Sequence, residues 1–170
     1  MPRKNRTWEP VESRLLSEWL AVRFPDAHVI QHVRVGTYRP AIDITGLTPE
    51  EIRALSVWRR WVDAVVLQDH LVTLIEASVI PDPGHVAELE LYLELWPMTP
   101  EFAEWRDVPT EGRLLYAVDD PVVRELAARR TIGVEVYRPP WVDEYLRRLP
   151  PRKRQAPRTI LPESWREKYT

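Results

Sequence analysis

Hydrophobic and polar residues along the chain form stretches that switch between helical and strand periodicity. The apolar positions of residues 10–24 recur at helical spacing, which predicts a first helix. Residues 28–35 alternate β-branched with polar side chains, as expected of a strand. Residues 60–68 and 71–80 are rich in Val, Leu and Ile, and the polar pair at 69–70 separates them. These two stretches are predicted to pair as antiparallel strands around a tight turn.

Several helix starts are marked by a capping residue followed by proline. Thr48, Asp82, Thr99 and Asp120 each precede a proline, and this order is typical of an N-cap followed by the first helical residue. Together with the remaining apolar stretches, these signals predict helices at about 49–57, 82–96 and 120–130, a short turn at 99–105, strands at 113–118 and 132–137, and a short helix after Pro140.

The order of the predicted elements defines a fold class. Apart from the short helix at 49–57, the order is α-β-β-β-α-β-α-β. Three strands in succession favour a meander, and strands separated by helices favour right-handed crossovers. We therefore expect an α/β fold with a mixed central sheet flanked by helices. Residues 1–146 would form this single domain, and residues 147–170 would form a C-terminal arm.

Composition excludes several classes of function. The 170 residues are 44% hydrophobic and 29% charged, as expected of one soluble domain. The absence of cysteine excludes disulfides, thiolate zinc sites and cysteine nucleophiles. With only five glycines and no phosphate-binding loop motif, the chain is not expected to bind a nucleotide cofactor. No apolar run has the length of a membrane span and no signal peptide is recognisable, so no membrane contact is expected.

Two acidic residues face each other across the predicted hairpin. A two-residue turn places Asp63 opposite Glu76, with apolar neighbours along both strands. Two carboxylates in such a row repel each other and lose hydration. A cation or a proton shared between them would reduce the repulsion. An acidic, oxygen-rich site of this kind suits Mg²⁺ or Mn²⁺. The alternative is a pair at the sheet rim that is satisfied by Arg59, Arg60 or a backbone donor.

A third acid lies on the first helix. Glu12 precedes the apolar residues Leu16, Trp19 and Leu20 by helical spacings, which directs its side chain toward the sheet. It would then complete a metal site with Asp63 and Glu76. The alternative is that Glu12 merely places a negative charge in the first helical turn, where the helix dipole favours it.

With these acids in place, residues 10–137 resemble the PD-(D/E)XK nuclease superfamily, which has an α-β-β-β-α-β core. In that family, an acid on the first helix, an Asp on the second strand and a Glu in an ExK triplet on the third strand hold a divalent metal. The matching positions are Glu12, Asp63 and Glu76. The resemblance implies hydrolysis of a DNA phosphodiester by a metal-bound water, with Mg²⁺ or Mn²⁺ as cofactor.

The chain departs from the family at the third position of the triplet. The resemblance implies catalytic roles for Asp63, Glu76 and the residue two positions beyond Glu76, which in the family is a lysine that helps to position or deprotonate the water. Here that residue is Ser78, and no lysine occurs between residues 5 and 152. A hydroxyl cannot supply the positive charge. Any nuclease activity is therefore expected to be weak.

The C-terminal arm concentrates positive charge. Residues 147–170 contain eight basic and two acidic side chains, whereas the net charge of the whole chain is -2. Prolines within the arm favour an extended conformation that can lie along DNA or a protein partner; a solvated tail is the alternative. The residues expected to contact nucleic acid or a partner are Arg147, Arg148, Arg152, Lys153, Arg154 and Arg158.

Two functions follow from these observations. The first is a metal-dependent endonuclease or exonuclease with a degenerate acidic site, working on DNA in the cytoplasm of a bacterial host. The second is a catalytically inactive protein of nuclease-like fold that acts as a DNA-associated or structural assembly component, for example in the head-tail or neck region of a phage particle. In the second case the arm would hold a homo-oligomer or a larger assembly together. The acidic triad favours the first function, and the missing lysine favours the second.

Overall fold

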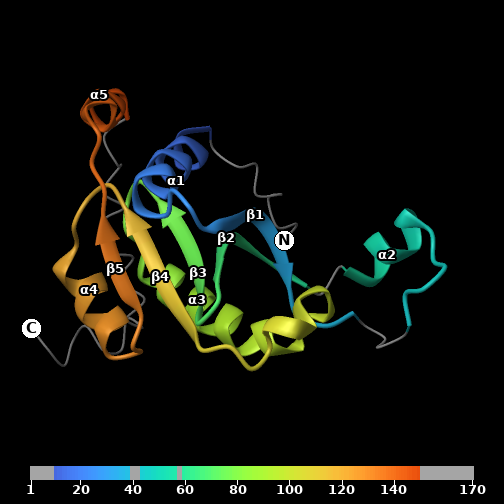
Figure 1. Ribbon diagram of the computed structural model, residues 1–170. Coiled ribbons are helices and arrows are strands. Elements are labelled where there is room, and N and C mark those ends of the chain that lie inside the picture. Colours follow the sequence, from blue (N-terminus) through green and yellow to red (C-terminus); the bar gives the residue numbers. More distant parts are fainter. Residues whose placement is uncertain (1–9, 39–42, 57–58, 150–170) are drawn as a thin grey trace, which may run out of the picture.

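A computed structural model of the protein describes residues 10–38, 43–56 and 59–149 (Figure 1). All predicted helices and strands are present in this part of the chain. The α-helices are α1 (Pro10–Arg23), α2 (Pro49–Leu55), α3 (Pro83–Leu95), α4 (Pro121–Ala128) and α5 (Pro140–Arg148), and two short 3-10 helices are η2 (Trp96–Met98) and η3 (Pro100–Trp105). The strands are β1 (His28–Val35), β2 (Arg60–Gln68), β3 (Leu71–Ser78), β4 (Thr110–Tyr116) and β5 (Gly133–Val136).

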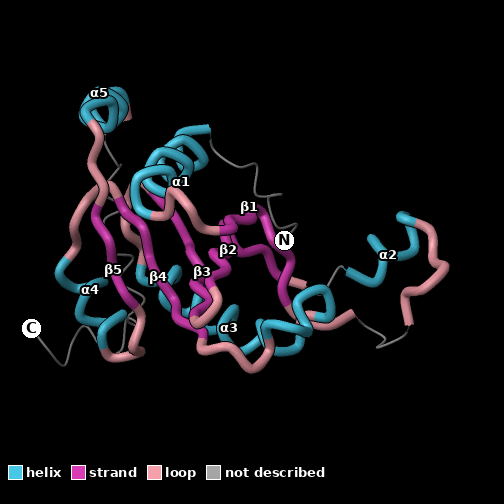
Figure 2. The backbone as a smooth tube through the Cα atoms, viewed as in Figure 1, coloured by secondary structure: helices cyan, strands magenta, loops and turns pink. Residues whose placement is uncertain are grey.

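The five strands form one mixed sheet in the order β1-β2-β3-β4-β5 (Figure 2). The first three strands pair antiparallel, and β4 and β5 add in parallel through the crossovers that contain α3 and α4. The expected α/β class with a mixed sheet flanked by helices is confirmed. No helix of the described residues is long and apolar enough to cross a membrane.

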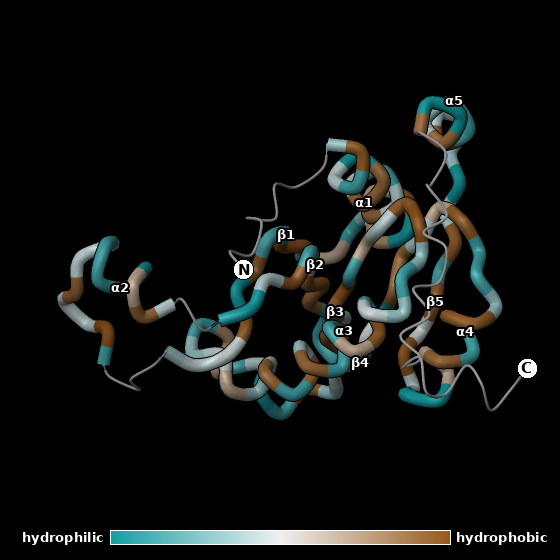
Figure 3. The backbone as a smooth tube through the Cα atoms, turned by 180° about the vertical axis from the view of Figure 1, so that it is seen from behind, coloured by the Kyte–Doolittle hydropathy of each residue, from teal (hydrophilic) through white to brown (hydrophobic). Residues whose placement is uncertain are grey.

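Helices cover both faces of the sheet and create two cores. Residues of α1, among them Leu16 and Trp19, pack with Ala64, Val66 and Ile75 on one face. On the other face, α3 and α4 pack against alternate residues of the same strands. In Figure 3, hydrophobic residues colour the strands between α1 and α3, whereas α5 is mostly hydrophilic. Burial of these two apolar surfaces is the main source of stability of the fold.

Three of the four predicted capping signals are confirmed, whereas the side chain of Thr99 does not cap η3 and instead accepts a hydrogen bond from the Gly36 amide. Thr48 accepts a hydrogen bond from the amide of Glu51, whose carboxylate accepts one from Thr48 in return, so α2 begins with a complete capping box. Asp82 caps α3 through the amide of Gly84. Asp120 caps α4 in the same manner. Each cap satisfies amide groups that a helix start leaves without partners.

Strand β4 is longer at its start than the sequence predicts. Its first three residues, Thr110 to Gly112, lack the apolar pattern of a strand, yet they pair in parallel with β3. A side chain at Gly112 would lie 3.0 Å from Leu93 and 3.1 Å from Leu89 of α3. The glycine therefore lets α3 pack closely on the sheet, and tertiary packing overrides the local signal for a loop.

The register of the hairpin is the predicted one. Gln68 faces Leu71 and Ala64 faces Ile75, so the turn contains the two predicted residues. Extending this register by one position places Asp63 opposite Glu76. The described pairs of β2 with β3 nevertheless end at Ala64. Asp63 thus lies where β2 begins to separate from β3, and in Figure 2 the start of β2 runs away from β3 toward α2.

The alternation of side chains shifts at the same point. Val62 and Val65 both belong to the core beneath α3, although their spacing would place them on opposite faces of a regular strand. In β1, the register places His32 opposite Asp63, and His32 has a positive φ of 56°. Both strands therefore change phase together, and the shift takes Asp63 out of the regular row that the sequence predicts.

Candidate functional site

The acidic pair of the hairpin is buried at the end of β3. Glu76 is 2% exposed and Asp63 is 3% exposed. Asp63 Oδ2 accepts a hydrogen bond of 2.8 Å from the backbone amide of Ala77. The alternative interpretation of the pair is that Arg59, Arg60 or a backbone donor satisfies it. The Ala77 amide is such a backbone donor for Asp63. Arg59 forms its ion pair with Glu101 instead of with either member of the pair.

Glu12 reaches the same segment from the other face of the sheet. The Ser78 hydroxyl donates a hydrogen bond of 2.7 Å to Glu12 Oε1, which links α1 to the end of β3. The expectation that Glu12 points toward the sheet is confirmed. Glu12 also lies in the first turn of α1, so a favourable interaction with the helix dipole is compatible with this contact.

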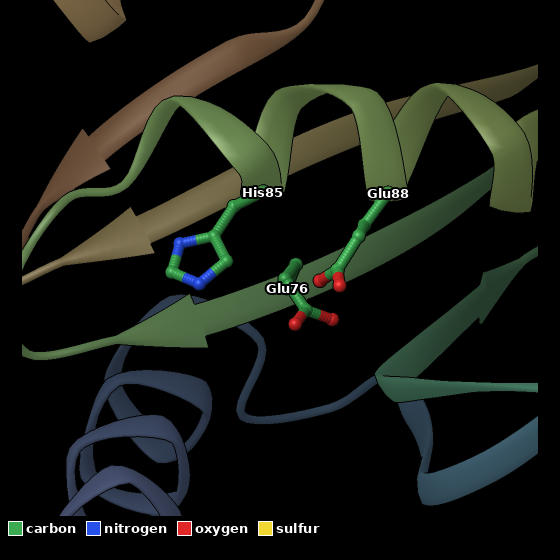
Figure 4. A group of neighbouring side chains, drawn as sticks. All are labelled: Glu76, His85 and Glu88. Carbon is green, nitrogen blue, oxygen red and sulfur yellow. The ribbon is translucent and has the colours of Figure 1, made fainter. Parts of the chain in front are cut away.

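A second helix brings two more candidate ligands to Glu76. The ligand atoms of Glu76, His85 and Glu88 all lie within 4.8 Å of one another, and we call these three residues the carboxylate–histidine cluster. His85 and Glu88 are half-buried and reach from α3 toward β3, with Glu76 between them (Figure 4). Among the described residues, it is the one such group of three that includes Glu76. Glu12 and Asp63 do not belong to it.

The position of α3 explains the cluster. Asp82 and Pro83 begin the helix beside the end of β3, and His85 and Glu88 are three residues apart, so both lie on one side of the helix. The His-x-x-Glu spacing was the available sequence signal. It is weak, because the spacing alone does not indicate which strand lies opposite.

Tyr116 of β4 adjoins the cluster. Its hydroxyl lies 3.4 Å from His85 Nδ1, and the two rings stack with their centroids 5.9 Å apart. Burial raises the pKa of Tyr116, and the negative charge of Glu76 raises it further. The phenol is therefore neutral at physiological pH. It can donate a hydrogen bond to His85 when that nitrogen carries no proton.

The donor set of the cluster fits a divalent cation. Two carboxylates and an imidazole offer oxygen and nitrogen ligands, a combination that suits Mn²⁺ well, and the oxygen ligands also suit Mg²⁺. Two carboxylates this close are destabilising in a poorly hydrated site unless a positive charge lies near them. The positive charge can come from a cation or from a proton on His85.

The predicted arm is described only at its beginning. Arg147 and Arg148 lie in the last turn of α5, where both form ion pairs with Glu144 at 3.0 and 2.7 Å. The helix thus extends two residues past the expected boundary of the domain at 146. Arg152, Lys153, Arg154 and Arg158 lie outside the described residues.

Comparisons of the chain with protein-family models, with curated proteins and with solved structures find no match. The class of protein is therefore defined by the fold and the site alone: an α/β protein with a five-stranded mixed sheet and a partly buried carboxylate–histidine cluster at the end of its central strand.

Proposed function

We propose that the protein is a divalent-metal-dependent nuclease-like hydrolase that cleaves phosphodiester bonds in DNA, with Mg²⁺ or Mn²⁺ held by Glu76, His85 and Glu88. One observation carries this proposal. The acid of the first helix and the acid of the second strand both bond to the triplet 76–78, at Ser78 and at Ala77. These are the elements from which the PD-(D/E)XK resemblance draws its metal-binding acids.

The site proposed here differs from the one implied by the resemblance. Glu76 is common to both, but His85 and Glu88 of α3 take the place of Glu12 and Asp63 as its companions in one group. The bond from Asp63 to the Ala77 amide holds the strand segment that carries Glu76. Asp63 is thus a positioning residue in this proposal, and Glu12 positions Ser78.

A bound divalent ion would lower the pKa of a water molecule and neutralise charge that develops on the phosphate. The chain supplies little else for the reaction. Ser78 donates its hydroxyl hydrogen to Glu12 and carries no positive charge, so it does not replace the lysine of the family. Weak activity with a strict requirement for metal is the consequence.

Metal binding is tested with Glu76→Gln, which keeps the size of the side chain and removes its charge. Calorimetric titration with Mn²⁺ should show binding to the wild type and at least a tenfold loss in the variant, because losing a group that only hydrogen-bonds to a metal ligand already costs roughly 10- to 100-fold in affinity. The matched control is Glu94→Gln, at an exposed position of α3. Equal Mn²⁺ binding by wild type and Glu76→Gln would refute the metal site.

Catalysis is tested separately. Branched, linear and single-stranded DNA are incubated with Mg²⁺ or Mn²⁺, and cleavage should be lost in Glu76→Gln and retained in Glu94→Gln. Cleavage that persists in EDTA would exclude the metal-dependent mechanism. Thermal unfolding adds a readout that does not depend on activity: Mn²⁺ at about 100 times its dissociation constant stabilises a binding protein by roughly 2.7 kcal/mol. That corresponds to a rise in Tm of about 5 to 11 °C in the wild type.

A second candidate function is favoured by Ser78. The hydroxyl at the lysine position is already engaged by Glu12, as expected if the fold has lost catalysis. In that case the protein is a DNA-associated or structural assembly component, in a phage particle or in the cytoplasm. The discriminating result is Mn²⁺ binding without cleavage of any DNA form, together with a particle larger than one chain in light scattering.

A further inference from the structure

A cleft distinct from the carboxylate–histidine cluster lies beside the second half of β1 and the start of β2. Its volume is about 440 Å³, and α2 and η3 complete its walls. Neither Glu76 nor the other members of the cluster line it. We call it the arginine–tryptophan cleft, after its main charged and aromatic residues: Arg34, Tyr38, Arg53, Arg59, Trp61 and Glu101.

The floor of the cleft is a rigid network around Arg59. This buried guanidinium binds both carboxylate oxygens of Glu101, at 2.6 and 2.8 Å, and also donates to the backbone oxygen of Arg34. It stacks on Tyr38, 4.6 Å from the ring centre, and the Tyr38 hydroxyl donates to the same carboxylate at 2.6 Å. Paired, bidentate contacts of this type hold an arginine in one orientation.

The network uses Glu101, the one acidic residue among the described residues that line the cleft, and among these residues Arg34 and Arg53 have no carboxylate partner. Within the described part of the chain, neither Arg34 nor Arg53 has a carboxylate at ion-pair distance. Arg34 donates to the Ser56 backbone oxygen, and Arg53 is exposed. Burial lowers the pKa of Arg34, and the positive charges of Arg59 and Arg53 lower it further. A surplus of positive charge in a partly buried cleft favours an anionic ligand.

The aromatic side of the cleft indicates which anion fits. Trp61 is 42% exposed, and the guanidinium of Arg34 lies over its ring, 4.5 Å from the ring centre, so an exposed aromatic side chain and a positive charge adjoin each other. Nucleic-acid bases stack on such aromatic and guanidinium planes while the phosphates meet the arginines. An acidic peptide would use the charges and leave the exposed ring without a role. The volume lies in the range of small-molecule sites, about 300 to 1,000 Å³, which accommodates nucleotides and not a duplex.

We propose that the arginine–tryptophan cleft binds single-stranded nucleic acid, with one base on Trp61 and the neighbouring phosphates at Arg34 and Arg53. His32 lines the cleft and, by the register of β1 with β2, lies opposite Asp63. One edge of the cleft therefore lies beside the strand position of Asp63, the residue that holds the segment carrying Glu76. The choice of DNA as the strand rests on the proposed function, whereas binding to the cleft requires neither metal nor catalysis.

The test measures the affinity of a fluorescein-labelled oligothymidine by anisotropy, in EDTA, so that loss of catalysis does not affect the result. Trp61→Ala should weaken binding by about 5- to 150-fold, the range for loss of one stacked base, and Trp61→Tyr should restore most of it. Arg53→Ala should reduce the slope of log affinity against log salt by about 0.7, as expected for one phosphate contact to a single strand.

The controls separate this proposal from the proposed function. Arg129→Ala removes another exposed arginine, at the end of α4, and should leave single-strand affinity unchanged. Glu76→Gln should abolish cleavage while it leaves oligothymidine binding intact. If Trp61→Ala and Arg53→Ala both bind like the wild type, the cleft is not the binding site. Competition by a glutamate decapeptide at the same charge concentration would also overturn the proposal, because it would show that charge alone governs binding.

Discussion

Ser78 shows how much of the predicted site depends on a single side chain. Its backbone position at the end of β3 is the one that the resemblance assigns to a lysine, and its partner Glu12 is a carboxylate at 2.7 Å. An amine at this position would lie next to the negative charge of the Glu12 carboxylate. The residue therefore limits the chemistry of the site without altering its architecture.

The first prediction restores the missing amine. Ser78→Lys should raise the rate of metal-dependent DNA cleavage by at least about tenfold, because a positioned amine adds proton transfer and charge stabilisation that the hydroxyl cannot provide. The rate is measured with a supercoiled plasmid and Mg²⁺ under single-turnover conditions.

Ser78→Met is the matched control, because methionine resembles lysine in length and carries no charge. A rise in rate that is equal in both variants would show that side-chain volume, and not the amine, changes the site. Circular dichroism establishes whether each variant keeps its secondary structure, since Ser78 is buried.

At the scale of elements, short-range signals specify most of this fold. The capping residues Thr48, Asp82 and Asp120 mark helix starts, because each satisfies amides of its own helix. The two-residue turn sets the register of β2 and β3 as far as the pair of Ala64 with Ile75, one position short of Asp63 and Glu76. Sequence reasoning fails where distant segments decide the outcome, as in the first residues of β4, which are a strand only because β3 pairs with them.

The same limit applies to the sites. His85 lies near Glu76 because of where α3 packs along β3. The helical spacing of residues in the sequence does not specify that position. The alternation of apolar and polar residues likewise does not predict the change of side-chain phase at His32 and Asp63. In the cleft, Arg59 and Glu101 are 42 positions apart in the chain, so their ion pair has no local signature.

The second prediction concerns the contact between α3 and β4. Gly112→Ala should lower the free energy of unfolding by about 1 kcal/mol, because the new Cβ meets Leu89 and Leu93 at 3.0 to 3.1 Å in a packed core. Gly133→Ala in β5 is the control, since its nearest new contact would be at 3.7 Å. Urea denaturation of both variants gives the difference. Equal stabilities would mean that α3 moves to accommodate the methyl group.

The whole molecule combines a body with excess negative charge and a strongly basic C-terminal segment. Residues 150–170 contain six basic and two acidic side chains in a chain whose net charge is -2. The body by itself is therefore expected to repel DNA at long range, except at local positive surfaces such as the arginine–tryptophan cleft. Duplex affinity should accordingly depend on the segment, and single-strand affinity on the cleft.

The third prediction tests this division of roles by truncation after Leu149, which retains α5 with Arg147 and Arg148. Removing residues 150–170 should flatten the salt dependence of duplex binding by about 0.9 in log-log slope for each phosphate that the segment neutralises. Single-strand binding in the cleft should keep its sensitivity to Trp61→Ala. If the segment instead holds an assembly together, light scattering will show a smaller particle while the duplex slope stays the same. If neither the slope nor the particle size changes, the segment is a solvated tail, and duplex binding belongs to the folded body.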